Sequence, residues 1–110
     1  MIEATFTFDV LTQDIVAVEI SGHAGFDVYG SDIVCSGISI LLISTINALE
    51  EYVGINTKAN VEEGHTTFQL YTADSTKRLQ AQALAHSLYM AYQGIEEEYS
   101  EYVHVISKEV

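Results

Sequence analysis

Residues 2–22, IEATFTFDVLTQDIVAVEISG, decide how the fold begins, because apolar side chains alternate with other residues through two runs of this stretch. Alternation with a period of two is typical of a β-strand with one buried face. The intervening VLTQD is short and polar enough for a turn, so residues 2–9 and 15–22 are predicted to form a hairpin. The residues expected on its buried face are Ile2, Ala4, Phe6 and Phe8 in the first strand and Val16, Val18 and Ile20 in the second.

The remaining chain predicts two helices, a second hairpin and a final strand. A long helix is expected from about Asp32 to Val53, with Gly54 as a left-handed C-cap. Residues 57–63 and 66–72 are predicted to pair around EEGH, and residues 102–108 to close the chain as a strand. Residues 73–99 are predicted to be helical and capped by Asp74 or Ser75. Core positions are expected at Val61, Phe68 and Leu70 in the hairpin, at Leu84, Leu88, Ala91, Ile95 and Tyr99 in the second helix, and at Val103 and Val105.

The resulting order is ββαββαβ, without the βαβαβ alternation of a parallel doubly wound sheet. We therefore predict an α+β fold, a mostly antiparallel sheet with two helices packed on it. The 110 residues contain no proline, and we find no linker or internal repeat, so residues 1–110 are predicted to form a single domain.

Charge and cysteine content restrict the partners and the compartment. The net charge of −12 disfavours nucleic acid and anionic membranes, which bind mainly cationic side chains, and favours a cationic protein partner. One cysteine cannot form an internal disulfide, and no signal peptide is apparent, so we expect a cytoplasmic protein. The longest apolar run, ISILLISTI, is about half of the roughly 18 residues needed to span a bilayer, so we expect no membrane association.

The first predicted helix is apolar on more than one side. One sheet face cannot cover the whole circumference of such a helix. A homodimer that buries the remaining apolar side is therefore expected. The residues that make the helix so apolar are Ile33, Val34, Ile38, Ile40, Leu41, Leu42, Ile43, Ile46 and Leu49.

The only cysteine, Cys35, lies in the stretch GSDIVCSGIS, twelve residues after His23. With Ser31 or Asp32 as N-cap, Cys35 would fall in the first helical turn, where the helix dipole favours a thiolate and free N–H groups can hold an oxyanion. Asp32, Cys35 and Ser39 would then share one helix face. His23, between the small residues Gly22 and Ala24, could act as base. A lone cysteine in a helix is more often a small buried hydrophobe, so spacing alone favours a structural thiol over a catalytic one.

The other histidines and the glycines do not suggest a further site. His65 is predicted to be a solvated turn residue, and His86 and His104 to lie on the surface or at an interface. The chain has no CxxC or HExxH spacing, so no metal is expected. Gly22, Gly25 and Gly30 do not match a dinucleotide fingerprint, so no cofactor is expected either. Gly25 and Gly30 could instead act as hinges of a flap formed by residues 24–31.

The pair GHA (residues 22–24) and GSDIVCSGIS (residues 30–39) resembles the signature of the ribosomal-processing cysteine proteases, the Prp family. The resemblance covers essentially the whole chain. It implies a dimeric cytoplasmic endopeptidase that removes the N-terminal extension of large-subunit ribosomal protein number twenty-seven and thereby supports ribosome assembly. It further implies that Cys35 is the nucleophile and His23 the base, with Gly22, Asp32 and Ser39 in supporting positions.

One departure from the family pattern concerns Ser36 and Gly37, where two small apolar residues are expected. Glycine weakens a helix interior, so the stiffness of this turn is in question.

Two alternatives stay open at this point. One is a non-enzymatic ribosome-assembly or protein-binding module in which Cys35 is structural and the acidic surface binds a cationic protein. The other is a thiol hydrolase that acts on a small metabolite.

Overall fold

The computed structural model describes residues 1–23 and 29–110 and confirms the predicted α+β fold and its order ββαββαβ. Every predicted helix and strand is present, with bounds that differ by a few residues at several ends. The elements are β1 (Ile2–Phe8), β2 (Ile15–Gly22), α1 (Tyr29–Asn47) continued by a π-helical segment (Ala48–Val53), β3 (Asn60–Glu62), β4 (His65–Gln69), α2 (Ser75–Glu98) and β5 (Val103–Glu109).

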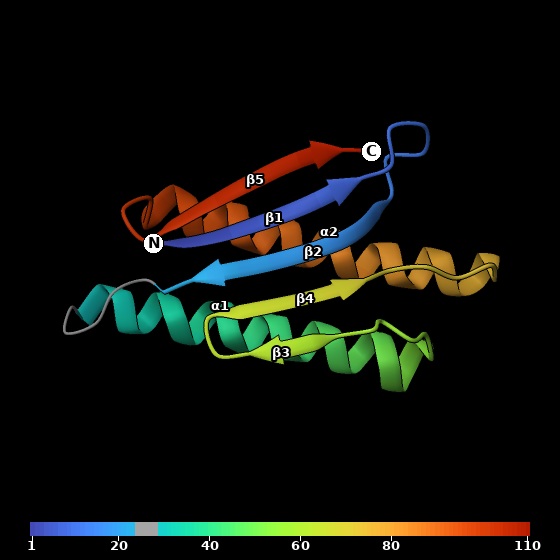
Figure 1. Cartoon of the computed structure of the whole chain (residues 1–110), viewed down its shortest axis with the longest axis horizontal. Coiled ribbons are helices and arrows are strands. Elements are labelled where there is room, and N and C mark those ends of the chain that lie inside the picture. The colour runs from blue at the N-terminus through green and yellow to red at the C-terminus, as the bar shows by residue number, and fades with distance from the viewer. Residues whose placement is uncertain (24–28) are drawn as a thin grey trace.

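The five strands form one sheet in the order β3-β4-β2-β1-β5 (Figure 1). The pairs β1–β2 and β3–β4 are antiparallel, as hairpins require. β2 and β4 are also antiparallel, whereas β5 pairs with β1 in parallel. β1 thus lies between the strand that follows it and the last strand of the chain. β3 and β5 are the two edges of the sheet.

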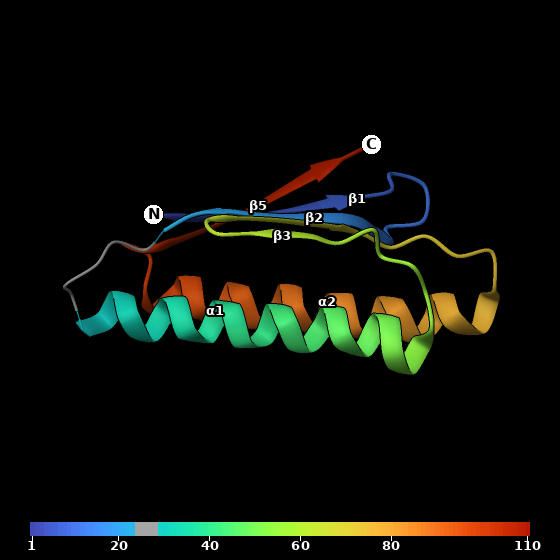
Figure 2. The same cartoon turned by 60° about the horizontal axis from the view of Figure 1, so that its bottom comes forward.

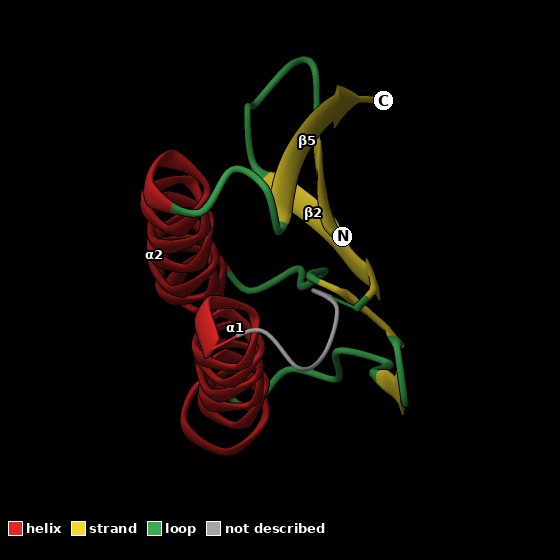
Figure 3. Cartoon of the chain, turned by 90° about the vertical axis from the view of Figure 1, so that its left-hand side faces the viewer, coloured by secondary structure: helices red, strands yellow, loops and turns green. Residues whose placement is uncertain are grey.

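Both helices lie on the same face of the sheet and run side by side along it (Figures 2 and 3). The buried face of the sheet carries apolar side chains at every second position of β1, and the helices bury their apolar faces against it. The largest fully buried side chains of this core are Tyr92, Phe6, Phe68, Ile15, Leu49, Val18, Val34 and Val103.

The first hairpin forms as predicted, with one change in its buried face. The register of β1 against β2 shifts between Thr7 and Phe8, where Thr7 pairs with Ala17 and Phe8 with Ile15. This irregularity places one extra residue, Val16, in β2 and reverses the alternation there. Ile15 is therefore fully buried, while Val16, predicted to be in the core, is only half-buried. Phe8 is half-buried as well.

The first helix begins three residues earlier than predicted and ends differently. It starts at Tyr29, so Tyr29 and Gly30 add to the helix ahead of Ser31 and Asp32. Its last six residues are π-helical. Gly54 adopts the predicted left-handed conformation, with φ of +83°, and its N–H bonds to the carbonyl of Leu49.

The second hairpin turns at Glu63 and Gly64, within the predicted EEGH. Phe68 and Leu70 are buried as expected, but the prediction that Val61 belongs to the core is wrong, since 63% of it is exposed. Val61 lies in β3, the edge strand, which has a neighbour on only one side. An edge position leaves an apolar side chain without the cover that a central strand has.

The second helix begins at the predicted cap, since the Asp74 side chain accepts a hydrogen bond from the Lys77 N–H. Its fully buried stripe consists of Ala81, Ala85, Leu88 and Tyr92. Only Leu88 of the predicted stripe belongs to this set. The other predicted members, Leu84, Ala91, Ile95 and Tyr99, are half-buried, because they flank the line of closest approach to the sheet. Val103 of β5 is buried and Val105 half-buried.

By length and composition alone, residues Ile33–Val53 would suffice to cross a membrane. A core helix of a folded domain passes the same test, and α1 contributes Val34, Ile38, Leu42 and Ile46 to the core. The apolar run contains serines and a threonine, but the mean hydropathy of the segment still reaches that of a membrane-spanning helix.

Tyr92 connects the two helices through its hydroxyl group. The ring is fully buried beside Phe6, with 5.9 Å between ring centroids, and the hydroxyl donates to the Ile38 carbonyl of α1 at 2.8 Å. Burial raises the pKa of Tyr92 well above its ordinary value, so the hydroxyl remains a donor at any physiological pH.

We predict that Tyr92→Phe lowers the free energy of unfolding by about 1 kcal/mol, because the substitution removes one buried hydrogen bond and keeps the ring. Urea unfolding followed by circular dichroism would measure the change. Tyr71→Phe is the matched control, since Tyr71 is 82% exposed. An equal loss in both variants would contradict a stabilising role for the hydrogen bond.

Candidate functional site

A cleft of about 340 Å³ opens between α1 and the end of the sheet where β2 finishes and the β3–β4 turn begins. It brings together segments that are far apart in the sequence. Its wall on α1 consists of Cys35, Ile38, Ser39, Leu42 and Ile43, and the opposite wall of Ile2, Ile20, Gly22, His23 and Val61–Thr66.

Cys35 and Ser39 line this cleft from the same face of α1, one helical turn apart, as their spacing predicts. Cys35 is a free, half-buried cysteine that packs against the edge of the hydrophobic core. Ser39 is exposed. The thiol is therefore neither fully enclosed nor fully solvated, and it borders a space that a ligand can enter.

The structure corrects the position of Cys35 within the helix. Because α1 begins at Tyr29, Cys35 is in the second turn, not the first. Only the first four N–H groups of a helix lack an intrahelical acceptor, so the unpaired donors lie about one turn before Cys35. The expectation that Cys35 lies in the first turn, among free N–H groups that can hold an oxyanion, is therefore wrong.

The same change removes the capping role predicted for Ser31 or Asp32, since both residues are already helical. An acidic residue in the first turn still suits the positive end of the helix dipole. The side chain of Asp32 lies outside the described residues, as do residues 24–28, which form most of the predicted flap.

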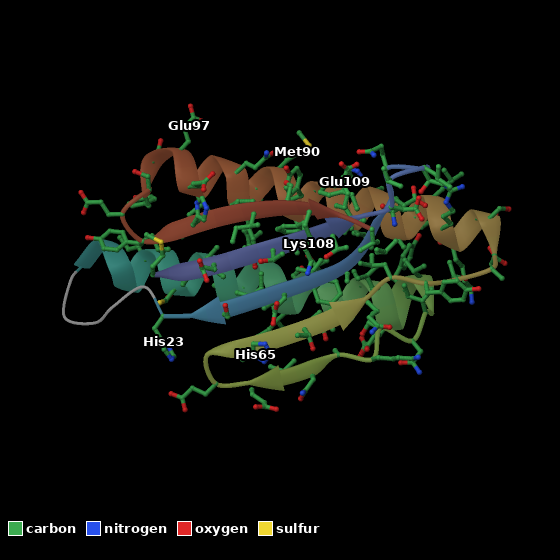
Figure 4. The ribbon with its side chains drawn as sticks, turned by 45° about the horizontal axis from the view of Figure 1, so that its top comes forward. His23, His65, Met90, Glu97, Lys108 and Glu109 are labelled. Atoms are coloured by element: carbon green, nitrogen blue, oxygen red, sulfur yellow. The ribbon has the colours of Figure 1, made fainter. Side chains whose placement is uncertain are left out.

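His23 follows β2 directly, as Figure 4 shows, and lines the same cleft as Cys35. Gly22 positions it through the backbone. Gly22 has φ of +90°, which side chains rarely tolerate, and a Cβ atom there would overlap the carbonyl oxygen of Met1. The nitrogen of Met1 donates to the carbonyl of His23 at 2.5 Å. A side chain at position 22 would therefore separate His23 from the start of β1.

His65 is a cleft residue that the sequence interpretation missed. It is the first residue of β4 rather than a solvated turn residue, and its Nε2 lies 2.8 Å from Glu19 Oε2 on β2 (Figure 4). It contributes to the lining of the cleft next to Gly64. The sequence does hold a signal, a second Gly-His pair at residues 64–65 that repeats the pair at residues 22–23. Sheet pairing of Ser21 with His65 brings the two pairs together.

The other two histidines lie away from the cleft. His86 is half-buried in α2, with Nδ1 2.9 Å from the Gln82 carbonyl. His104 lies in β5, is exposed, and has its Nδ1 3.2 Å from Glu96. Among the residues that the structure describes, no three His, Cys, Asp or Glu side chains gather in a way that could hold a metal ion.

The charge of the described cleft lining is negative. Glu62 and Glu63 border it, and within the described part of the chain no lysine or arginine does. The histidines His23 and His65 are its only groups that can become cationic in that part. The cleft thus combines an apolar floor, a thiol, an imidazole and an acidic rim, an arrangement that suits a peptide with cationic residues.

Comparisons with known proteins agree on one family. The sequence model of the family described as cysteine protease Prp matches residues 1–104. A ribosomal processing cysteine protease Prp of Staphylococcus aureus strain Mu50 is 32% identical over 98 residues, covering 86% of this chain and 92% of that protein. The corresponding protein of Bacillus subtilis strain 168 is 28% identical over 96 residues, covering 84% and 86%.

The fold agrees as well. A crystal structure of the S. aureus protease Prp, in complex with a covalently linked product peptide, superposes with a TM-score of 0.85 at 28% identity. The superposition covers 98% of this chain and all of that one.

Proposed function

The chain belongs to the cysteine protease Prp family, and we propose that it is an endopeptidase in which Cys35 is the nucleophile and His23 the general base. The observation that carries the assignment is that these two residues, from α1 and from the end of β2, line opposite walls of one cleft. A cysteine and a histidine that line one ligand-sized cleft can supply the nucleophile and the base for acyl transfer. The covalently linked peptide in the S. aureus structure supports a covalent mechanism for the family.

The proposed reaction has two stages, acylation of Cys35 and hydrolysis of the resulting thioester. His23 takes the thiol proton of Cys35, and the sulfur attacks the carbonyl carbon of the scissile peptide bond. The tetrahedral intermediate then collapses, the protonated His23 gives its proton to the leaving amine, and a thioester remains on Cys35. Water, deprotonated by His23, hydrolyses the thioester and releases the acid product and the free thiol. Ser39, on the same wall as Cys35, supports substrate binding, and Gly22 sets the position of His23.

The substrate we propose is the N-terminal extension of large-subunit ribosomal protein number twenty-seven, cleaved in the cytoplasm. Support comes from the relatives, which are ribosomal processing cysteine proteases, and from the charge of this chain. A ribosomal protein is cationic, whereas this chain has a net charge of −12 and an acidic cleft rim. A single cysteine, which forms no internal disulfide, suits a reducing compartment.

We predict that Cys35→Ala abolishes cleavage, and that His23→Ala lowers kcat by a factor of roughly 10² to 10⁴, the usual contribution of a general base. The measurement is incubation with the extended ribosomal protein followed by mass spectrometry of the products. Ser36→Ala is the matched control, because Ser36 is exposed, adjacent to Cys35 and outside the cleft lining. Full activity of Cys35→Ala would contradict the assignment of the nucleophile, whereas no cleavage by the unmodified protein would favour the alternative, a binding module with a structural thiol.

We predict that kcat/KM for the ribosomal protein falls as salt rises, while kcat changes little, because salt screens attraction between the acidic enzyme and the cationic substrate. Steady-state rates from about 50 to about 500 mM NaCl span Debye lengths from beyond 10 Å to below 5 Å. The double variant Glu62→Gln and Glu63→Gln should flatten this dependence more than Glu97→Gln with Glu98→Gln on α2. A flat response of the unmodified enzyme would leave the charge without a role in recognition.

We also propose that the protein is a homodimer that buries the outer face of α1. Ile33 and Ile40 are exposed there, at positions i and i+7, which is one side of a helix, and the exposed Ile43 lies between this side and the cleft. The opposite side of α1 already packs in the core, so intramolecular contacts leave this apolar stripe uncovered. A second copy of the chain offers the same stripe, as a two-fold interface requires.

We predict that Ile40→Glu converts the dimer into a monomer, because it places a charge at the centre of the stripe, where Ile40 is 68% exposed. Light scattering after size-exclusion chromatography would measure the mass. Leu79→Glu is the control, since Leu79 is an apolar residue of α2 that is 73% exposed. A monomeric unmodified protein, or dissociation by Leu79→Glu alone, would refute this interface.

A further inference from the structure

Gly64, in the β3–β4 turn, lies directly against the imidazole of His23. An ideal Cβ atom on Gly64 would be 2.7 Å from His23 Nε2 and 3.1 Å from Cε1. Separations under 3.0 Å are essentially never seen for real Cβ atoms, so the ring occupies the space that any side chain at position 64 would need. Figure 4 shows the ring of His23 beyond the end of β2, on the side of the β3–β4 turn.

The backbone reinforces this contact. The N–H of Gly22 donates to the carbonyl of Gly64 at 3.0 Å, and the nitrogen of Met1 donates to the carbonyl of His23. The Ser21–Gly22 peptide unit before His23 and the peptide unit that follows the His23 α-carbon are thus each bonded to another segment. With its backbone fixed in this way, the remaining freedom of His23 lies in its side-chain rotations, and Gly64 limits where the ring can lie.

We propose that Gly64 is a positioning residue for His23: its lack of a side chain lets the imidazole lie in the cleft that it shares with Cys35. The inference rests on the proposed function, in which His23 is the base. A methyl group on Gly64 would displace the ring, because the ring is the end of a rotatable side chain and yields more readily than the backbone. A displacement of about 1 Å in a reacting group can cost about 100-fold in rate.

Gly64 also has φ of +76°, so any substitution strains the turn, and that effect has to be separated from displacement of the ring. Gly54 offers the matched control. Its φ is +83°, and a Cβ atom there would meet only Lys77 Nζ, at an ordinary 3.6 Å. Gly54→Ala therefore carries the same kind of backbone strain without touching the cleft. Asparagine tolerates a left-handed backbone better than alanine, so Gly64→Asn and Gly54→Asn form a second pair that keeps the Cβ atom and reduces strain.

The test compares the unmodified full chain with both pairs of glycine variants, with His23→Ala, and with His23→Ala combined with Gly64→Ala. Urea unfolding measures stability, cleavage of the extended ribosomal protein gives kcat and KM, and iodoacetamide labelling gives the reaction rate of Cys35. We expect the alanine variants at 54 and 64 to lose similar stability. Only substitutions at 64 should lower kcat, by about 10-fold or more, with little change in KM. Gly64→Ala should slow Cys35 labelling in the unmodified background and leave it unchanged in the His23→Ala background.

Two results would overturn the inference. One is equal kcat for the 64 and 54 variants, which would make Gly64 an ordinary turn glycine. The other is an equal slowing of Cys35 labelling with and without His23, which would show that Gly64 acts on the sulfur by another route. Unchanged cleavage and labelling by His23→Ala itself would instead contradict the proposed catalytic pair, so the two failures are distinguishable. If Gly64→Ala fails to fold, the asparagine pair supplies the same comparison.

Discussion

The structure depends on the need of two helices to cover one face of a five-stranded sheet. That face presents Phe6 at its centre, with Tyr89 and Tyr92 of α2 edge-on to its ring at centroid distances of 4.9 and 5.9 Å. Aromatic pairs in this geometry gain more than burial alone provides. Because both helices serve the same face, they lie side by side, and Tyr92 can bond to a carbonyl of α1. The cleft lies at the edge of this arrangement, where α1 faces the end of β2 and the β3–β4 turn, and Gly22 and Gly64 belong to its lining.

Features set by neighbouring residues were predictable from the sequence. Local preferences for caps, turns and alternation account for the order of the elements, the left-handed Gly54, the cap at Asp74 and the turn at Glu63 and Gly64. Features set by distant partners were not. The irregularity opposite Phe8 and the exposure of Val61 depend on strand register and on which strand forms the edge. The parallel pairing of β5 with β1 likewise involves segments from opposite ends of the chain.

The candidate site shows the same division. The sequence placed Cys35 and Ser39 on one helix face, which one helix can specify, and the structure puts both on the cleft wall. It could not show that His23 lines the same cleft, since a separation of twelve positions in the sequence fixes no spatial relation between His23 and Cys35. It also misplaced the helix start, because Ser31 and Asp32 are favourable both as caps and within a first turn. His65 and Gly64 reach the site only through the pairing of β4 with β2.

The pairing of Ile2 with Val103 has a consequence for the order in which the molecule can be assembled. β1 can form its hairpin with β2 as soon as residue 22 is available, because that contact is local. The other edge of β1 stays unpaired until β5, the last strand, is available. During synthesis and early refolding, β1 therefore exposes a row of free N–H and C=O groups. Such an edge is a template for pairing with another chain, so aggregation is a hazard of the nascent state more than of the finished protein.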